Sequence, residues 1–267
     1  MHRRLGLPLA VLGAVLLVCL IPATRQPARP VAPFLIYYGW IPGGAAQRTL
    51  AKQFAGYPVV VLGSGEEWSG RGTDHAQAVH VIAAERGTSF YGYVNLGRTN
   101  GQPAHSLDYI GRALRAWRAM GARGVLLDCA GPDYGVSRGR LRAAVRIAHR
   151  SGLRVLVNAW DPSAVIGVGL TSHDAWLAEN WVTGDGKVVA KQAADWPALR
   201  RLAAHGIAVW MTATDDRPPG SAWVDAWAPH TALTVGGNAI AVSGAQYSSR
   251  SNAVVPADWV TQALQGQ

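Results

Sequence analysis

Short apolar runs alternate with longer amphipathic segments along the chain from Phe34 onward. Short β-branched runs are typical of buried strands, and apolar residues spaced three or four apart are typical of helices. We expect eight strands, over 34–38, 59–62, 89–94, 124–128, 154–158, 175–179, 208–212 and 239–243. Helices are expected over 45–55, 73–86, 106–120, 138–151, 191–205 and 221–233, and a last one over 256–264.

The segment from residue 138 to residue 157 shows the repeating unit most clearly. Leu141, Val145 and Ala148 recur at helical spacing, and arginines occupy the other face. A Ser-Gly pair ends this helix, and a strand follows at once. Repeated βα units in a chain of this length favour one (β/α)8 barrel over an open doubly wound sheet. The link over 161–174 fits the pattern least, as a short helix or a loop.

The amino terminus differs from the rest of the chain. Residues 1–24 begin with basic residues and continue through an uncharged apolar stretch over 5–21, which predicts a signal peptide or a membrane anchor. Residues 25–33 are a Pro-rich linker, and residues 34–267 form the barrel domain. Both alternatives place the barrel outside the cytoplasm, extracellular or at the cell surface, and the second anchors it through residues 5–21.

Net charge and cysteine content say little about partners. Four of the 25 basic residues lie in the first thirty positions, which leaves 21 against 16 acidic residues in the barrel. No basic block interleaved with aromatic residues is present, so we expect no nucleic-acid partner. Cys129 is the one cysteine of the barrel, so no disulfide can form within it. We expect a monomer.

Polar and aromatic side chains gather where the predicted strands end. Asp128 ends the fourth strand and Glu179 the sixth, and the carboxyl ends of barrel strands share one mouth. We expect this pair to be catalytic. The expected substrate-binding residues around it are Tyr38, Trp40, Asn95, Asp133, Asn158, Trp160, Trp181, Asp215 and Tyr247.

This mixture of residues suits a carbohydrate, because sugar faces stack on aromatic rings and glycoside cleavage uses two carboxyl groups. Plainer roles remain open for several of these residues. Asp128 could cap the following loop, whereas Asp133 and Asp215 could be turn or loop residues.

The eight histidines are scattered without a metal-binding spacing, and no phosphate-binding glycine loop occurs. We therefore expect no metal and no cofactor.

Three segments, 124–138, 157–162 and 174–180, resemble the spherulin-4-like and endo-α-1,4-polygalactosaminidase-like glycoside hydrolases. The likeness runs from Phe34 to about Tyr247. Asp128 and Glu179 match the acids that end the fourth and sixth strands in that superfamily, and Cys129 stands where a second acid is usual. The resemblance implies a secreted or surface-anchored enzyme that cleaves an exopolysaccharide containing galactosamine, without a cofactor.

A mechanism follows from this resemblance. Asp128 would be the nucleophile or charge stabiliser, and Glu179 the general acid and base. Two alternatives remain open: a carbohydrate-binding barrel whose catalytic activity is impaired, and an extracellular barrel that acts on something other than a glycan.

Overall fold

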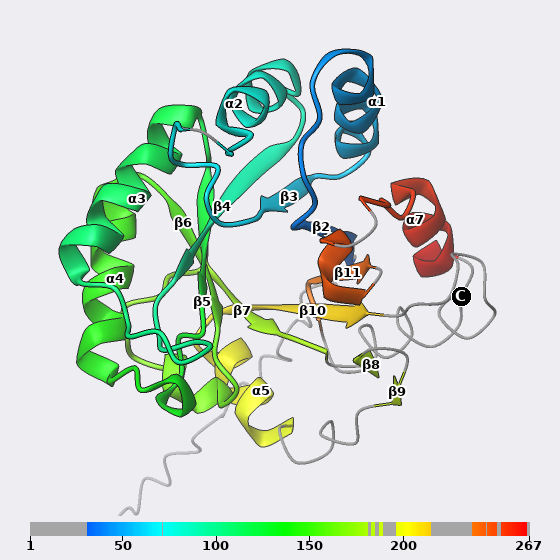
Figure 1. Cartoon of the computed structure of the whole chain (residues 1–267). Helices are drawn as coiled ribbons and strands as arrows, with labels where there is room; N and C mark the ends of the chain where they lie inside the picture. The colour runs from blue at the N-terminus through cyan, green and yellow to red at the C-terminus, as the bar shows by residue number, and fades with distance from the viewer. Residues whose placement is uncertain are drawn as a thin grey trace, which may run out of the picture.

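A computed structural model describes residues 31–70, 72–180, 183–184, 187–188, 196–214, 237–243, 245–249 and 252–265. These residues form nine parallel strands in a nearly closed barrel with helices on its outer side (Figure 1). The expected α/β fold of the TIM-barrel type is confirmed. The predicted helix over 221–233 lies outside the described residues.

The strands follow the predicted positions closely. They are β1 (Ala32–Pro33), β2 (Leu35–Tyr37), β3 (Val59–Leu62), β4 (Ser89–Asn95), β5 (Gly124–Asp128), β6 (Arg154–Asn158), β7 (Ala175–Ala178), β10 (Ala208–Thr214) and β11 (Ala239–Ser243). A separate antiparallel pair consists of β8 (Thr183–Gly184) and β9 (Lys187–Val188). All eight predicted strands are present, and β1 is an addition to them.

One segment near the start of the barrel joins the two ends of the sheet. The strand order is β1-β11-β10-β7-β6-β5-β4-β3-β2, so β1 and β2 stand at opposite ends of it. These strands are consecutive in the chain: β1 pairs with β11, and β2 pairs with β3. Between them, the Phe34 N–H donates to the Ile240 carbonyl at 3.0 Å. Residues 32–37 therefore bring the sheet edges together.

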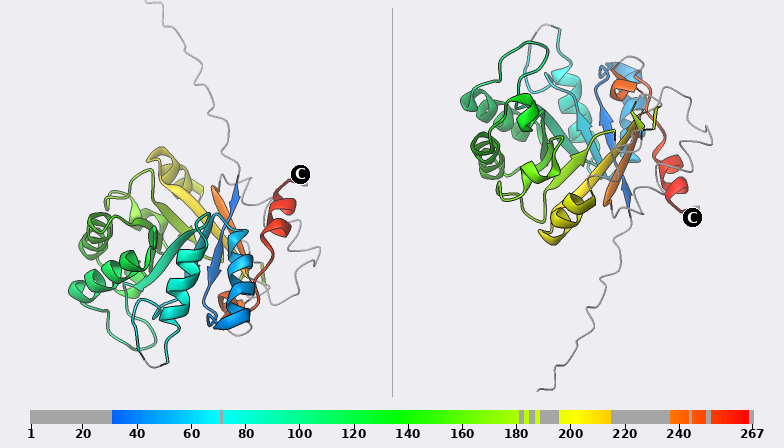
Figure 2. Two further views of the ribbon diagram at one scale, coloured as in Figure 1. Left: turned by 90° about the horizontal axis from the view of Figure 1, so that it is seen from above. Right: turned by 90° about the horizontal axis from the view of Figure 1, so that it is seen from below.

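The helices surround the strands in both views of Figure 2. They are α1 (Gly44–Ala55), α2 (His75–Ala84), α3 (Leu107–Met120), α4 (Arg138–Arg150), α5 (Trp196–Ala204) and α7 (Ala257–Gln265). Three single 3₁₀ turns are η1 (Pro132–Tyr134), η2 (Pro162–Val165) and η4 (Ala245–Ser248). The uncertain link over 161–174 thus contains a 3₁₀ turn and no α-helix.

Local side-chain chemistry sets the ends of the two helices beside β5. Ser106 and Ser137 cap α3 and α4 by accepting backbone N–H groups three residues ahead, each at 3.2 Å. Gly121 ends α3 in the left-handed region at φ 103°. The two serines thus begin the helices, and Gly121 ends α3 and returns the chain to β5.

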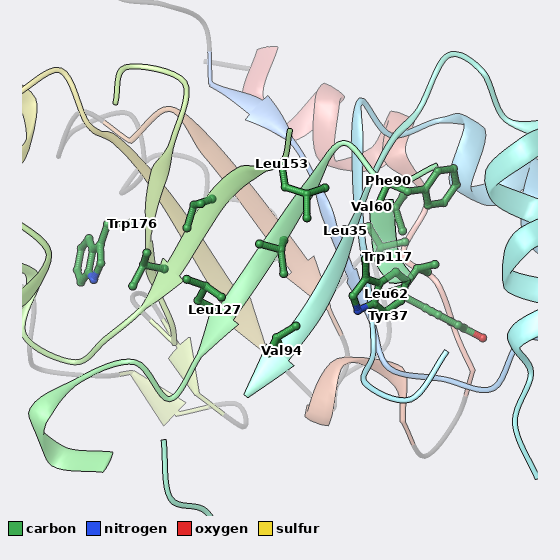
Figure 3. Packing of buried hydrophobic residues seen from close by; sticks show 14 of the residues in the cluster. Leu35, Tyr37, Val60, Leu62, Phe90, Val94, Trp117, Leu127, Leu153 and Trp176 are labelled. Carbon is green, nitrogen blue, oxygen red and sulfur yellow. The ribbon is translucent and has the colours of Figure 1, made fainter. Parts of the chain in front are cut away.

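The larger hydrophobic core lies between the strands and the helices (Figure 3). Trp117 of α3 is fully buried and packs against β4. A Cβ atom on Gly92 would lie 2.1 Å from the Trp117 ring, so only glycine allows this contact. The Trp117 indole N–H donates to the Tyr93 carbonyl at 3.1 Å. This packing fixes the strand that carries Tyr93.

The inside of the barrel changes from apolar to polar toward the strand ends. Leu126, Leu156 and Leu177 belong to one interior cluster and are at most 1% exposed. Strand residues two apart point to the same side, so the next interior positions are Asp128, Asn158 and Glu179. A leucine layer therefore closes the space beneath a polar layer.

The apolar stretch over 5–21 lies outside the described residues. Within the part of the chain that the structure describes, no helix combines the length and apolar character needed to cross a membrane.

Candidate active site

Asp128 stands at the carboxyl end of β5 and accepts hydrogen bonds from side chains on both neighbouring strands. The Tyr93 hydroxyl of β4 donates to Oδ2 at 2.5 Å, and the Asn158 amide of β6 donates to Oδ1 at 2.8 Å. The Cys129 thiol lies 3.5 Å from Oδ2 and donates to it. Asp128 is half-buried, so its carboxylate is fixed in place but still reaches the mouth.

Glu179 directly follows β7 and is also half-buried. The Asn158 amide donates to Oε2 at 2.8 Å, and the Tyr247 hydroxyl donates to Oε1 at 3.0 Å. Tyr247 in turn shares a 3.0 Å hydrogen bond with the Thr212 hydroxyl of β10. Four elements thus converge on this carboxyl group.

A single amide nitrogen bridges the two carboxyl groups. Asn158 Nδ2 lies 2.8 Å from an oxygen of Asp128 and 2.8 Å from an oxygen of Glu179, so these oxygens are no more than twice 2.8 Å, or 5.6 Å, apart. The two N–H bonds of one amide can serve two acceptors at once. A substrate atom at the mouth can therefore meet both carboxyl groups.

Burial over the leucine layer is the main cause that raises the pKa of Glu179. The nearby negative charge of Asp128 raises that pKa further, whereas the hydrogen bonds from Asn158 and Tyr247 oppose the rise. Burial also raises the pKa of the Tyr93 and Tyr247 hydroxyls, with the two carboxyl groups adding to it. Both tyrosines therefore stay neutral and act as hydrogen-bond donors.

The residue after each acid adopts an unusual backbone conformation. Cys129 has φ 48° and Asn180 has φ 50°, both in the left-handed region that non-glycine residues rarely enter. The Asn180 N–H donates to Thr212 Oγ1 at 2.9 Å, and its side-chain oxygen accepts from Thr214 at 3.0 Å. Such conformations cost free energy, are held by surrounding contacts and concentrate at functional sites.

Aromatic side chains lie around the carboxyl pair, half-buried beside it or exposed at the mouth. The Tyr38 ring packs edge-on against Tyr93 and Tyr247, with centroids 5.6 and 5.3 Å away. Trp160 and Trp40 are 42% and 49% exposed, and both follow barrel strands. The Trp160 indole N–H donates to the Tyr134 hydroxyl at 3.2 Å, which holds one edge of the ring. Each tryptophan presents an apolar face near the mouth.

Two predicted binding residues lie at the mouth without bonding the carboxyl pair. The Asn95 amide donates to Thr99 Oγ1 at 2.7 Å, and its oxygen accepts the Gly97 N–H at 3.1 Å, so Asn95 shapes the loop after β4. Asp133 lies exposed in η1. Trp181 and Asp215 lie outside the described residues. By contrast, Tyr38, Asn158 and Tyr247 line or bond the pair.

Two contributors to the site are absent from the sequence prediction. Tyr93 and Thr212 lie within strands, where their types suggest packing, yet both hydroxyls belong to the hydrogen-bond network of the acids. The period-two pattern is the signal that could have found them. Tyr93 follows the interior residue Tyr91 by two positions, and Thr212 follows Trp210 in the same way.

The donor set at the mouth contains carboxyl, amide and hydroxyl groups. Within the described residues, no three His, Cys, Asp or Glu side chains gather in an arrangement that could hold a metal ion.

Comparisons with known proteins add information on the fold. No family model and no curated protein matches the chain. The carboxyl transferase domain from Rhizobium etli pyruvate carboxylase, with oxamate and biotin, matches with a TM-score of 0.56 at 10% identity, over 90% of this chain and 48% of that one. An N-acetylmannosamine-6-phosphate 2-epimerase from Clostridium perfringens matches with 0.47 at 13% identity, over 89% and 94%. An AP endonuclease, family 2, from Brucella melitensis matches with 0.49 at 11% identity, over 82% and 94%. Such low identities show the barrel fold alone.

The predicted membership in the spherulin-4-like and endo-α-1,4-polygalactosaminidase-like superfamily is wrong, and so is the exopolysaccharide hydrolysis it implied. No family model and no curated protein matches the chain, so no sequence relative supports that superfamily, and the carboxyl transferase domain that shares its barrel fold is not a glycoside hydrolase. The likeness rested on three short segments at strand ends. Barrels of many functions place acids there, so such segments do not define a family. The alternative of a carbohydrate-binding barrel with impaired activity is dropped as well, because the impairment was inferred from Cys129 standing where that superfamily has an acid.

Proposed function

We propose that the mouth of the barrel is an acid–base active site in which Glu179 transfers a proton and Asp128 remains a carboxylate. The bridge made by Asn158 carries this proposal, because one amide donates to both carboxyl groups at 2.8 Å. Two acids that share a site and differ in environment are suited to opposite roles.

The hydrogen bonds support this division of roles. Asp128 accepts from Tyr93, Asn158 and Cys129, all of which stabilise a negative charge. Glu179 accepts from two side chains, and burial raises its pKa. Glu179 is therefore the group that gives a proton to a substrate heteroatom and takes one back. Asp128 stabilises the positive charge that develops on the substrate.

The charges at the mouth support a neutral or cationic substrate. Among the residues that the structure describes, His149 and Asp174 form the one ion pair. In this part of the chain, no cationic side chain therefore neutralises Asp128 or Glu179. A phosphate or carboxylate group would be repelled by the pair. The exposed face of Trp160 gives an apolar part of the substrate a place to pack.

The basic and apolar residues at the amino terminus support a second part of the proposal, that the barrel works outside the cytoplasm. Mass measurement of the protein isolated from its host, combined with fractionation, separates a cleaved signal from a retained anchor. A full-length protein found in the cytoplasm would contradict export.

Substrate profiling tests the proposed chemistry. Wild type, Glu179→Gln and Asp128→Asn are incubated with pools of neutral, cationic and anionic small molecules, and consumption is followed by mass spectrometry. Asp108→Asn, an exposed carboxylate on α3, is the matched control. We expect compounds of the neutral or cationic pools to be consumed by wild type and the control only. Turnover that survives both site substitutions, or that is confined to anionic compounds, would contradict the proposal.

A substrate-independent measurement examines the pair itself. Carbon NMR titration of labelled glutamate side chains, with Glu179→Gln for assignment, reads the pKa of Glu179 directly. We expect it above the ordinary value for glutamate, because burial and Asp128 both oppose ionisation. In the Asp128→Asn variant, the pKa of Glu179 should fall toward the ordinary value for glutamate.

A further inference from the structure

The positive charge of the barrel is concentrated on two neighbouring helices. α3 and α4 lie side by side on the outer side of the barrel (Figure 1). Together they contain eight arginines and one aspartate, whereas the barrel as a whole has 21 basic and 16 acidic residues. The excess of positive charge therefore lies on this pair of helices.

The arginines of α3 and α4 fall into two groups of four. One group donates to backbone carbonyl groups of the neighbouring loops, and it consists of Arg118, Arg138, Arg140 and Arg142. In the described part of the chain, the other four guanidinium groups have neither an ion-pair partner nor a hydrogen-bond acceptor, and they belong to Arg112, Arg115, Arg146 and Arg150. Each guanidinium group has five N–H donors, so the second group is available to a ligand.

Three of these four available arginines line one groove between the helices. Arg112 and Arg115 line it from α3 and Arg150 lines it from α4, and all three are exposed. The groove has a volume of about 540 Å³. Sites for small molecules usually measure about 300–1,000 Å³, so the groove is large enough for a ligand of several linked groups.

The surroundings of Gly111 show that the Arg115 head group lies in the groove. A Cβ atom on Gly111 would lie 3.4 Å from Arg115 Nη1 and 3.7 Å from Ile147 Cγ2 of α4. Gly111 and Ile147 both line the groove, so Arg115 Nη1 lies close to its floor. The Arg112 guanidinium lies over the Tyr109 ring, 5.9 Å from the ring centre, a contact that uses none of its N–H donors.

The arginines of the groove repel one another without a neutralising partner. Arg112 and Arg115 are three positions apart on one helix, so their side chains are neighbours of like charge. Asp108 also lines the groove, but the one ion pair among the described residues is formed elsewhere, by His149 and Asp174. A ligand with several negative charges would remove this repulsion.

We infer that the groove between α3 and α4 binds a soluble ligand with two or more linked phosphate groups, through Arg112, Arg115 and Arg150. A phosphate group carries up to two negative charges and three acceptor oxygens, which the planar guanidinium group meets with paired N–H donors. The three arginines lie on both sides of the groove. Linked phosphate groups can span these positions, whereas a single phosphate occupies a small part of the volume.

The surface of these helices favours a soluble ligand over an anionic membrane. Helices that lie on membranes insert aromatic or leucine side chains beside their basic residues. In the described part of the chain, the exposed large hydrophobic residues are Trp40 and Trp160, and neither lies on α3 or α4. The groove is also separate from the mouth, where the carboxyl pair repels anions, so the inference goes beyond the proposed function and does not depend on turnover.

Calorimetric titration of the full-length protein with inorganic tripolyphosphate at low salt tests the groove. We expect the double variant Arg115→Gln/Arg150→Gln to lower affinity about tenfold or more, because two charged donors are lost. Arg200→Gln/Arg201→Gln is the matched control, since it removes two exposed arginines of α5 and therefore the same charge. We expect it to lower affinity by less than about twofold, because charges beyond a Debye length are screened.

Equal losses in the two double variants would show attraction by net charge alone and would overturn the inference. Asp108→Asn keeps every arginine and removes a negative charge from the groove, so affinity should rise about twofold. An unchanged or lower affinity in this variant, with thermal unfolding as in wild type, would also count against the site.

Two further ligands test the class of anion. Citrate carries carboxylates instead of phosphates, and we expect it to bind at least about threefold more weakly than tripolyphosphate. Citrate binding as tight as that of tripolyphosphate would overturn the choice of phosphate. Phosphatidylglycerol vesicles that bind wild type but not Arg115→Gln/Arg150→Gln, without any binding of tripolyphosphate, would show a membrane surface in place of a ligand groove.

Discussion

The two ends of β7 each carry a carboxylate, and the two differ in the groups that hold them. Asp174 immediately precedes the strand and Glu179 immediately follows it. Asp174 lies at the amino-terminal end of the barrel and is 2% exposed, whereas Glu179 lies at the mouth and is half-buried.

Backbone groups and a histidine hold Asp174. Its oxygens accept the Val155 N–H at 2.8 Å and the Thr171 N–H at 2.7 Å, and the Thr171 hydroxyl donates at 2.9 Å. His149 forms an ion pair with it at 3.0 Å. Glu179 accepts from two side chains, Asn158 and Tyr247. Asp174 is thus held mainly by the backbone at the amino-terminal end of the strand, whereas at the mouth only side chains donate to Glu179 among the described residues. The contrast fits a structural role for Asp174 and the role proposed for Glu179.

The largest expected effect is on turnover at the mouth. Glu179→Gln keeps the shape of the side chain, but it replaces one of the two accepting oxygens with an NH2 donor and cannot transfer a proton. We expect turnover of a substrate found by profiling to fall by about 10²–10⁴-fold. Among the described residues two side chains and no backbone group donate to this carboxyl, so thermal unfolding should change less than it does in Asp174→Asn. A variant that keeps its activity would remove Glu179 from the reactive role.

A substitution at the opposite end of β7 should lower the free energy of unfolding and leave turnover unchanged. Asp174→Asn replaces one of the two accepting oxygens with an NH2 group, so the N–H of either Val155 or Thr171 loses its acceptor, and His149 loses its carboxylate partner. We expect a loss of about 2–4 kcal/mol in the free energy of unfolding, measured in urea. Turnover of the folded fraction stays near wild type. If Asp174→Asn instead abolished turnover in a stable protein, the contrast between the two ends would fail.

The pH dependence of turnover should change when a hydrogen bond to Glu179 is removed. The raised pKa keeps Glu179 protonated to a higher pH than an ordinary glutamate, so turnover falls as pH rises through that pKa. The Tyr247 hydroxyl stabilises the ionised form. Tyr247→Phe removes this donor, raises the pKa further and moves the fall to higher pH. A shift to lower pH in rate profiles of the two proteins would contradict this role.

The smallest expected effect concerns one hydroxyl at the structural end. Thr171→Val removes the side-chain donor to Asp174 and keeps its backbone donor. We expect a loss of about 1 kcal/mol in the free energy of unfolding, with no change in the pH profile of turnover. A change in that profile would show that the two ends of β7 are coupled.

The strands and the acids could be predicted from sequence because their signals are local. The apolar runs over 124–128 and 154–158 are strands as predicted, and Asp128 ends the first of them. The partners of the acids depend on neighbours far apart in the chain. Tyr247 reaches Glu179 across 68 positions, and Tyr93 reaches Asp128 across 35. The pairing of β4 with β5 brings Tyr93 to Asp128, and the nearly closed barrel brings Tyr247 to Glu179.

The prediction of the substrate class was wrong for a different reason. Aromatic residues and two acids at a barrel mouth are compatible with several chemistries, and the sequence pattern does not report their hydrogen bonds. Asn95 illustrates this: its position predicts substrate binding, and nothing in the sequence indicates that its side chain also bonds Thr99 and Gly97 within its own loop. Glu66 illustrates the reverse, since a loop glutamate reads as a solvated charge, whereas the fold buries it.

A left-handed residue follows each of the two acids proposed to be catalytic. At Cys129 and Asn180 the chain turns away from its strand, and contacts to the barrel hold each turn: the Ala130 N–H donates to the Asn158 carbonyl, and the Asn180 N–H to Thr212. Each acid is thus anchored at the end of its strand. Exchanging or lengthening the loop that starts at residue 131 should alter ligand choice while Asp128 keeps its position, so the barrel offers a scaffold on which specificity can be re-engineered by loop grafting.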